Sequence, residues 1–259
     1  MSNVELSVII PSIRVENLTK IYFFLEKAIE PYSFELIVVG PYAIPDELWN
    51  KENIKEIKDF GSPSRCVQLA SSIADGKYMM WLSDDLTFLT PQSLSQCIQL
   101  FESNKISDKD AVCLRYFEGE GVNEFAENYW YAWTHEDQRL AGINKEWKIA
   151  PLGMYNTSYF RELGGLDCIH YEHINMCTHD LAFRLQQNGG KIHLSPQSIA
   201  RFYWSWPGPD AKPIQDAYFL NDKSAYKEMY NKDQSDRIKI DYWNWTQVDN
   251  KWKRRFGEK

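Results

Sequence analysis

Two adjacent carboxylates, Asp84 and Asp85, follow an apolar run that reads YMMWL over residues 78–82. Such a run without polar alternation is typical of a strand that is buried on both faces of a parallel sheet. Two unit charges about 4 Å apart repel by roughly 4 kcal/mol at an effective dielectric constant near 20. A divalent cation would turn this repulsion into a shared attraction, because hard cations favour oxygen ligands. The pair therefore indicates a metal site, and a solvated turn is the alternative.

The elements that must position this pair alternate between strand and helix. Apolar runs predict strands over 6–12, 34–40 and 54–60, and apolar stripes at helical spacing predict helices over 18–29, 63–73 and 91–101. We expect Ser62 and Thr90 to cap the second and third helices, since a proline follows each of them. This alternation predicts a parallel sheet with right-handed crossovers, in which ligands bind outside the carboxyl ends of the strands. Asp84 and Asp85 lie at such an end.

The second half of the chain is less regular. Strands are predicted over 111–117 and 191–196, and helices over 178–190 and about 215–230. Thr178 is the expected cap of the first of these helices, which places Asp180 in its first turn. No repeat, linker or low-complexity segment interrupts the sequence. We therefore expect a single domain over 1–259, with residues 1–110 and 111–259 as its two halves.

The composition limits the classes of protein to which the chain can belong. Its 259 residues are enough for a sizeable core, and 44% of them are apolar. The net charge of −7 and the pI near 5.3 argue against a nucleic-acid-binding protein, which normally carries a basic face. Five cysteines without a C-x-x-C pair, and the lack of a signal peptide or an apolar run of membrane-spanning length, predict a cytoplasmic protein. Nothing in the sequence predicts the oligomeric state.

An ordered set of motifs resembles the family 2 glycosyltransferases of the GT-A fold. The motifs are SVIIPS (7–12), ELIVV (35–39), SPSRCVQLASSIADGKYMMWLSDD (62–85), RELGGLD (161–167) and HDLAFRLQQNGGKI (179–192). The resemblance implies an α/β fold with a Rossmann-like, mixed but mostly parallel sheet flanked by helices, and a less regular acceptor-side region. It also implies inverting transfer of a sugar from a nucleotide-sugar donor, a UDP-sugar, with Mn²⁺ or Mg²⁺ as cofactor. The acceptor would be a glycan or a lipid-linked sugar, as in bacterial surface-polysaccharide synthesis.

The resemblance assigns donor-side roles to residues of the first half, which would be the nucleotide-sugar-binding half. Asp85 would bind the metal ion, and Asp84 and Ser83 would contact the donor. Arg65 would meet the diphosphate or be a solvated arginine at a helix end. Asp59 would read the base, because Gly40 stands where the family commonly has an acid. The ends of the first two strands would flank the base and ribose, through Pro11, Ser12 and Gly40.

The second half would bind the acceptor. Inversion needs a carboxylate that takes the proton of the attacking hydroxyl, and the resemblance makes Asp180 this base. His179 would stand beside it, and Arg184 would orient it, touch phosphate or form only a surface ion pair with it. Trp204 and Trp206 would lie on a loop that closes over the substrates, or would pack in the core. The basic and aromatic tail WKRRF (252–256) would give a peripheral membrane contact at the inner membrane face, or be a solvated terminus.

Three alternatives depend on the same segments. Cys168, His170, His173, Cys177 and His179 could bind zinc, although their spacing matches no regular zinc motif. The residues Ser83, Gly40 and His179 depart from the family pattern, so a catalytically silent nucleotide-sugar-binding relative stays open. A haloacid-dehalogenase-type phosphatase is disfavoured because Ser83 occupies its nucleophile position. A dinucleotide-dependent dehydrogenase is excluded because no G-x-G-x-x-G follows the first strand.

Overall fold

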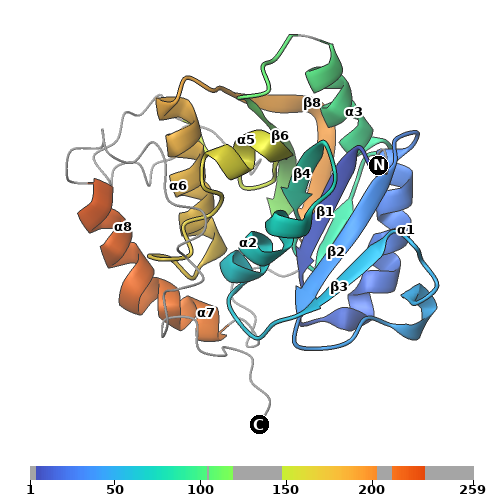
Figure 1. Cartoon of the computed structure of the whole chain (residues 1–259), viewed down its shortest axis with the longest axis horizontal. Coiled ribbons are helices and arrows are strands. Elements are labelled where there is room, and N and C mark those ends of the chain that lie inside the picture. The colour runs from blue at the N-terminus through green and yellow to red at the C-terminus, as the bar shows by residue number, and fades with distance from the viewer. Residues whose placement is uncertain (1–3, 104, 119–147, 203–211, 231–259) are drawn as a thin grey trace.

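The computed structural model describes residues 4–103, 105–118, 148–202 and 212–230 (Figure 1). The strands are β1 (Leu6–Pro11), β2 (Phe34–Gly40), β3 (Ile54–Lys58), β4 (Tyr78–Trp81), β5 (Leu86–Phe88), β6 (Ala111–Glu118), β7 (Gly153–Asn156) and β8 (Ile192–Phe202). The α-helices are α1 (Leu18–Ile29), α2 (Pro63–Ile73), α3 (Ser93–Glu102), α5 (Thr157–Glu162), α6 (Ile174–Gln187), α7 (Lys212–Ala217) and α8 (Lys223–Tyr230). Two 3-10 turns, η1 (Val15–Asn17) and η2 (Asp46–Leu48), and one π-helical turn, η4 (Tyr218–Asp222), complete them.

All these strands belong to one sheet, in the order β3-β2-β1-β4-β7-β6-β8-β5. The strands β1, β2, β3 and β4 are mutually parallel, as the alternation of strand and helix predicted. Strand β7 is antiparallel to β4 and β6, and β5 is antiparallel to β8. Strand β6 therefore runs in the same direction as β4 and pairs with β8 in parallel. This confirms the expected α/β class with a mixed, mostly parallel sheet.

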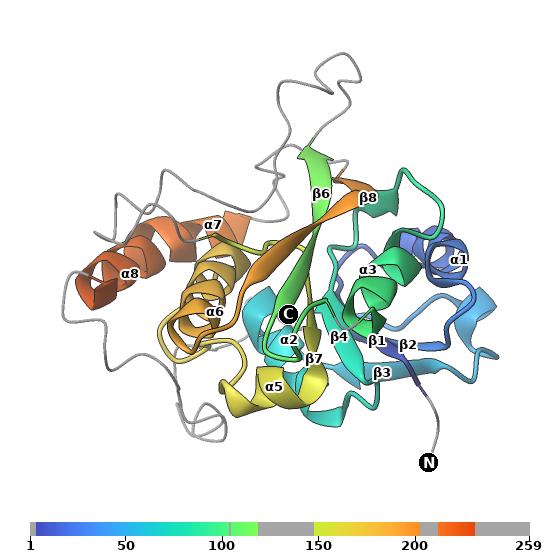
Figure 2. The same cartoon turned by 90° about the horizontal axis from the view of Figure 1, so that it is seen from above.

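Helices cover both faces of the sheet, as Figures 1 and 2 show. The side chains of each strand alternate between the two faces, so Ile9 of β1 packs with α2, α5 and α6, while Val8 and Ile10 pack with α1 and α3. The side chains of β2 alternate in the same way, with Ile37 on the face of α2, α5 and α6 and Leu36 on the face of α1 and α3. The central strands are apolar without alternation because both faces are covered, and this rigid centre holds the strand ends in place.

Two predicted helix caps are wrong. Helix α3 begins at Ser93, after Gln92 in a left-handed conformation with φ 56°, and the Thr90 hydroxyl accepts a hydrogen bond from the Ile199 amide of β8. Helix α6 begins at Ile174 and is capped by the Nδ1 atom of His173. Thr178 lies inside α6, where its hydroxyl donates to the Asn175 carbonyl. The Thr90 side chain thus bonds to a neighbouring strand instead of capping α3, and His173 caps α6 in place of Thr178. The cap of α2 by Ser62 is confirmed.

The short elements β5, β7 and α5 were not predicted, because each spans only three to six residues. Strand β8 continues well beyond the predicted 191–196, and the predicted helix over 215–230 is the succession α7, η4 and α8. None of the helices in the described ranges is both long and apolar enough to span a bilayer.

Candidate active site

The carboxyl ends of β1, β2, β3 and β4 meet at one edge of the sheet. Direct backbone hydrogen bonds join them: the Ser12 amide donates to the Val39 carbonyl at 2.9 Å, and the Asp59 amide donates to the Gly40 carbonyl at 3.1 Å. Gly40 is required here, because a Cβ atom on it would lie 2.0 Å from the Ser12 carbonyl oxygen. The structure thus brings Pro11, Ser12, Gly40, Asp59 and the strand-tip acids to one edge.

The carboxylate of Asp84 is buried and already bound by the loop that follows β1. Its Oδ2 atom accepts the amides of Ile13 and Arg14 at 2.9 and 2.8 Å and the Ser12 hydroxyl at 3.3 Å. Its Oδ1 atom pairs with the Arg14 guanidinium at 2.6 Å, and Asn17 donates to its backbone carbonyl at 2.9 Å. Burial raises the pKa of Asp84, although Arg14 and the two amides oppose this change. The guanidinium of Arg14 therefore offsets the negative charge of Asp84.

This clamp was not foreseen, and Arg14 and Asn17 were not among the predicted site residues. A signal was nevertheless present. Arg14 follows the end of the first strand, and Asp84 follows the end of a strand predicted to be parallel to it. Since carboxyl ends of parallel strands meet at one edge, a cation and an anion at these two positions are expected to approach each other.

Asp85 is the strand-tip acid whose setting suits a metal ion. The Ser83 hydroxyl donates a hydrogen bond to its Oδ1 atom. Within the described ranges no three or more His, Cys, Asp or Glu residues gather into a metal-binding group. One carboxylate is a sufficient protein contribution to a Mg²⁺ or Mn²⁺ ion that is also held by substrate phosphates and water. The residues present therefore fit a metal ion that binds together with a diphosphate.

Asp59 and Arg65 form an ion pair beside the N-terminus of α2. The Arg65 Nε atom lies 3.0 and 3.1 Å from the two Asp59 oxygens, and its Nη2 atom lies 3.1 Å from Oδ2. The Gly61 amide donates to the same carboxylate at 2.8 Å. Asp59 and Arg65 thus both lie at the predicted edge, where they form an ion pair with each other. Their roles toward the base and the diphosphate stay predictions.

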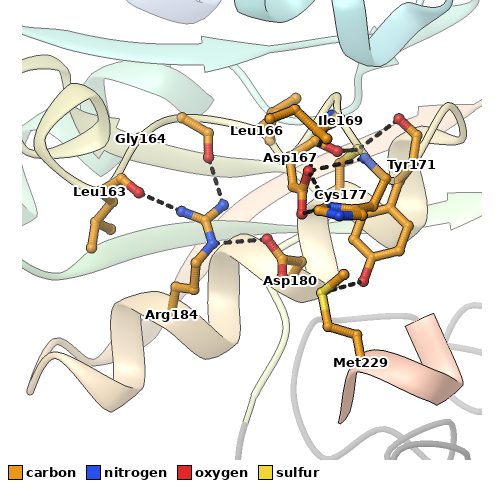
Figure 3. Close-up of polar contacts among 12 residues, drawn as sticks. Leu163, Gly164, Leu166, Asp167, Ile169, Tyr171, Cys177, Asp180, Arg184 and Met229 are labelled. Carbon is orange, nitrogen blue, oxygen red and sulfur yellow. Dashed lines mark hydrogen bonds and ion pairs between the residues drawn. The ribbon is translucent and has the colours of Figure 1, made fainter. Parts of the chain in front are cut away.

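Asp180 does not lie in the first turn of α6, contrary to our expectation. It is completely buried, and its Oδ2 atom accepts a 2.8 Å hydrogen bond from Arg184, one turn further on (Figure 3). Arg184 is equally buried and donates to the carbonyls of Leu163 and Gly165 at 2.6 Å each. The i,i+4 pair is therefore present, but it fastens α6 to the Gly164-Gly165 turn rather than lying on the surface. The assignment of Asp180 as the base stays a prediction that this geometry does not favour.

The other residues predicted on the acceptor side have different settings in the structure. His179 is buried, with its ring 6.3 Å from that of Tyr226 in α8. Cys177 bonds to the Ser64 hydroxyl at 3.1 Å, and His173 caps α6, so the proposed zinc ligands do not converge in the described part of the chain. Trp204, Trp206 and the tail 252–256 lie outside the described residues.

The fold, a curled, mostly parallel sheet flanked by helices, matches that of solved structures of GT-A glycosyltransferases. The structure of GalNAc-T7 with UDP, GalNAc and Mn²⁺ matches with a TM-score of 0.61 and 13% identity, over 92% of this chain and 50% of that one. Staphylococcus aureus TarS 1–349 matches with a TM-score of 0.57 and 16% identity, over 95% of this chain and 73% of that one. The complex of TarS 1–349 with UDP-GlcNAc matches with a TM-score of 0.55 and 16% identity, over 93% of this chain and 72% of that one.

These likenesses establish the fold. The chain spans only half the length of the GalNAc-T7 chain that it matches. No model of a known protein family matches the sequence, and no curated protein matches it closely enough to count as a relative. Membership of family 2 therefore stays a prediction.

Proposed function

We propose that this protein is a glycosyltransferase that moves a sugar from a UDP-sugar to a hydroxyl group of a glycan or lipid-linked acceptor, with inversion. The observation that carries the proposal is the sequence Ser83-Asp84-Asp85 at the carboxyl edge of a GT-A sheet. Matching structures contain UDP with Mn²⁺, and UDP-GlcNAc, at low sequence identity. The cytoplasmic location, a peripheral membrane contact and a place in surface-polysaccharide synthesis belong to the same proposal.

The donor would lie along the ends of β1, β2 and β4. Asp84 holds the loop after β1 against the tip of β4, so the backbone of Ser12 and Ile13 is fixed where a base and ribose would pack. Ser83 would contact the donor. Arg65 would give up some of its hydrogen bonds to Asp59 and donate to the diphosphate instead. Asp85 would hold Mn²⁺ or Mg²⁺ together with that diphosphate. Such an ion supplies electrostatic stabilisation of the charge that develops on the leaving group.

A test follows from the proposed role of Asp85 as the metal ligand. We expect Mn²⁺ alone to leave the melting temperature unchanged, UDP alone to raise it slightly, and UDP with Mn²⁺ to raise it clearly. Asp85→Ala should lose the part that depends on Mn²⁺. Asp108→Ala, which alters an exposed acid outside the site, is the matched control and should keep the full response. If UDP and UDP-sugars with Mn²⁺ have no effect on the wild-type protein, the proposal is wrong.

A second candidate is a catalytically silent relative that binds nucleotide sugars. The observation that favours it is the engagement of Asp180 by Arg184, which removes the expected base from the surface. Its signature would be a melting-temperature response to UDP-sugars with Mn²⁺ and no release of UDP.

A further inference from the structure

A carboxylate–histidine pair lies in the loop between the Gly164-Gly165 turn and α6. The Nδ1 atom of His170 lies 3.0 and 2.9 Å from the two oxygens of Asp167 (Figure 3 shows Asp167). Asp167 is completely buried, and its Oδ1 atom also accepts the amides of Ile169 and His170 at 3.1 Å each. The His170 side chain is 42% exposed. The aspartate is therefore fixed inside the protein while the ring reaches solvent.

This geometry selects one form of the neutral imidazole. Because the Asp167 carboxylate accepts a hydrogen bond from Nδ1, the proton of the neutral ring lies on Nδ1 and the Nε2 atom keeps its lone pair. No described residue forms a hydrogen bond with His170 Nε2. A buried carboxylate, an oriented imidazole and an available Nε2 atom are the parts of a general base.

The loop 167–173 contacts the first turn of α2, which begins at the carboxyl edge of the sheet. The Ser64 hydroxyl, in the first turn of α2, donates to the Glu172 carbonyl at 3.0 Å. Helix α2 starts at the carboxyl end of β3, and Ser64 is the neighbour of Arg65. His170 is two residues from Glu172, so at most about 7 Å of chain separate them. The backbone of His170 thus lies within about 7 Å of the residue that contacts the first turn of α2, where the diphosphate is proposed to bind.

The π-helical turn η4 holds this loop from its other side. Asp222 accepts the amides of Glu172 and His173 at 2.7 and 2.6 Å, and Asn221 donates to the His170 carbonyl at 3.2 Å. π-Helical turns are rare and frequently occur at functional sites. Here the turn directs Asp222 and Asn221 at the loop that carries His170, so the imidazole stands on a backbone fixed at three points.

We propose that His170 is the catalytic base of the transfer and that Asp167 positions it. The inference rests on the proposed function. The Nε2 atom takes the proton of the acceptor hydroxyl while the oxygen of that hydroxyl forms a bond to the anomeric carbon of the donor sugar. The bond from that carbon to the diphosphate oxygen breaks, and its electron pair leaves with UDP. The imidazolium, stabilised by Asp167, then releases the proton to water.

The experiment compares His170→Gln with His193→Gln. His193 also pairs with an aspartate, at 3.0 Å from Asp110, but at the amino ends of β6 and β8, away from the site. UDP release is measured from UDP-glucose, UDP-galactose, UDP-GlcNAc and UDP-GalNAc, with water and with simple sugars as acceptors. We expect His170→Gln to lower kcat by about 100-fold or more without weakening UDP binding. His193→Gln should match the wild type, and added imidazole should partly restore turnover to His170→Ala.

The role of Asp167 has a spectroscopic signature that a merely structural residue would not alter. Nitrogen NMR of the histidine side chains should show the Nδ1–H tautomer of His170 in the wild type and its loss in Asp167→Asn. Asp167→Asn should also lower kcat and leave the KM for the donor unchanged.

The outcomes separate the two proposals. If the wild type does not bind UDP with Mn²⁺, the proposed function fails. If it binds UDP-sugars and His170→Gln releases UDP at the wild-type rate, only the base assignment fails. Binding without any UDP release by the wild type, or an Nε2–H tautomer at His170, would also overturn the assignment.

Discussion

The guanidinium of Arg14 lies 2.6 Å from the carboxylate of Asp84, although 70 residues separate them in the sequence. This pair ties the loop after β1 to the tip of β4. Arg14, Asp84 and Asp85 together carry a formal net charge of −1, because the one cation offsets one of the two acids. Asp84 therefore organises the loop after β1, whereas Asp85 is the residue that we propose as the ligand of the metal ion.

Asp84→Ala should lower the free energy of unfolding by about 2–4 kcal/mol, because it leaves the amides of Ile13 and Arg14 and the Arg14 guanidinium without their acceptor. Asp85→Ala should lower it by less, because it removes the acceptor of one neutral hydroxyl, that of Ser83, and does not leave the Arg14 guanidinium without its counter-charge. Urea unfolding without nucleotide measures both. Equal losses in the two variants would show that Asp84 has no special structural role.

Asp180→Asn should lower the free energy of unfolding by about 3–5 kcal/mol, because it leaves the fully buried Arg184 without its counter-charge. Replacing both partners, as in Asp180→Leu with Arg184→Met, should restore part of that stability. Urea unfolding of the single and double variants tests this. A stable Asp180→Asn protein that binds UDP and releases none would instead support Asp180 as the base.

His173 should make the protein sensitive to mild acid. Burial lowers its pKa from the ordinary 6.5 to about 4, and its Nδ1 atom must be unprotonated to accept the Asn175 amide. Between these two pH values the folded state binds fewer protons than the unfolded state, so stability is complete above pH 6.5 and falls as the pH is lowered. The loss by pH 4 amounts to about 3 kcal/mol, at about 1.4 kcal/mol per pKa unit.

His173→Asn keeps a side-chain acceptor at the cap but does not titrate, so its stability should change less over this range. Thermal unfolding of both proteins between pH 4 and 7 gives the comparison. Parallel curves for the two proteins would mean that another group causes the acid sensitivity.

Gly40→Ala should destabilise the site edge, because the new Cβ atom would lie 2.0 Å from the Ser12 carbonyl and the backbone would have to move. We expect a loss of about 1–3 kcal/mol in unfolding free energy and weaker UDP binding. Gly189→Ala is the matched control. Its Cβ meets nothing within 4 Å, and its φ of +85° imposes a strain of about 1–2 kcal/mol without changing UDP affinity. Unchanged UDP affinity in Gly40→Ala would show that Gly40 is not part of the donor-binding site.

The sequence by itself determined the central architecture. The strands β1, β2 and β4 are continuous apolar runs, and α1 and α2 carry apolar stripes at helical spacing, so burial on two faces or on one face could be predicted locally. Parallel pairing followed from the alternation, and with it the position of Asp84 and Asp85 at a carboxyl edge. Short elements such as β5 and α5 could not be predicted, because their few residues carry no period and are stabilised by their neighbours.

Only the tertiary structure decided which polar groups at that edge are engaged. Asp84 is bound by Arg14, and Asp180 is buried with Arg184, which reaches the carbonyls of Leu163 and Gly165. Three histidines within ten residues have three different settings: His170 pairs with Asp167, His173 caps a helix and His179 packs against Tyr226. Residue type and spacing predict which chemistry a segment can offer. Which groups remain available depends on partners that only the folded chain brings within hydrogen-bonding distance.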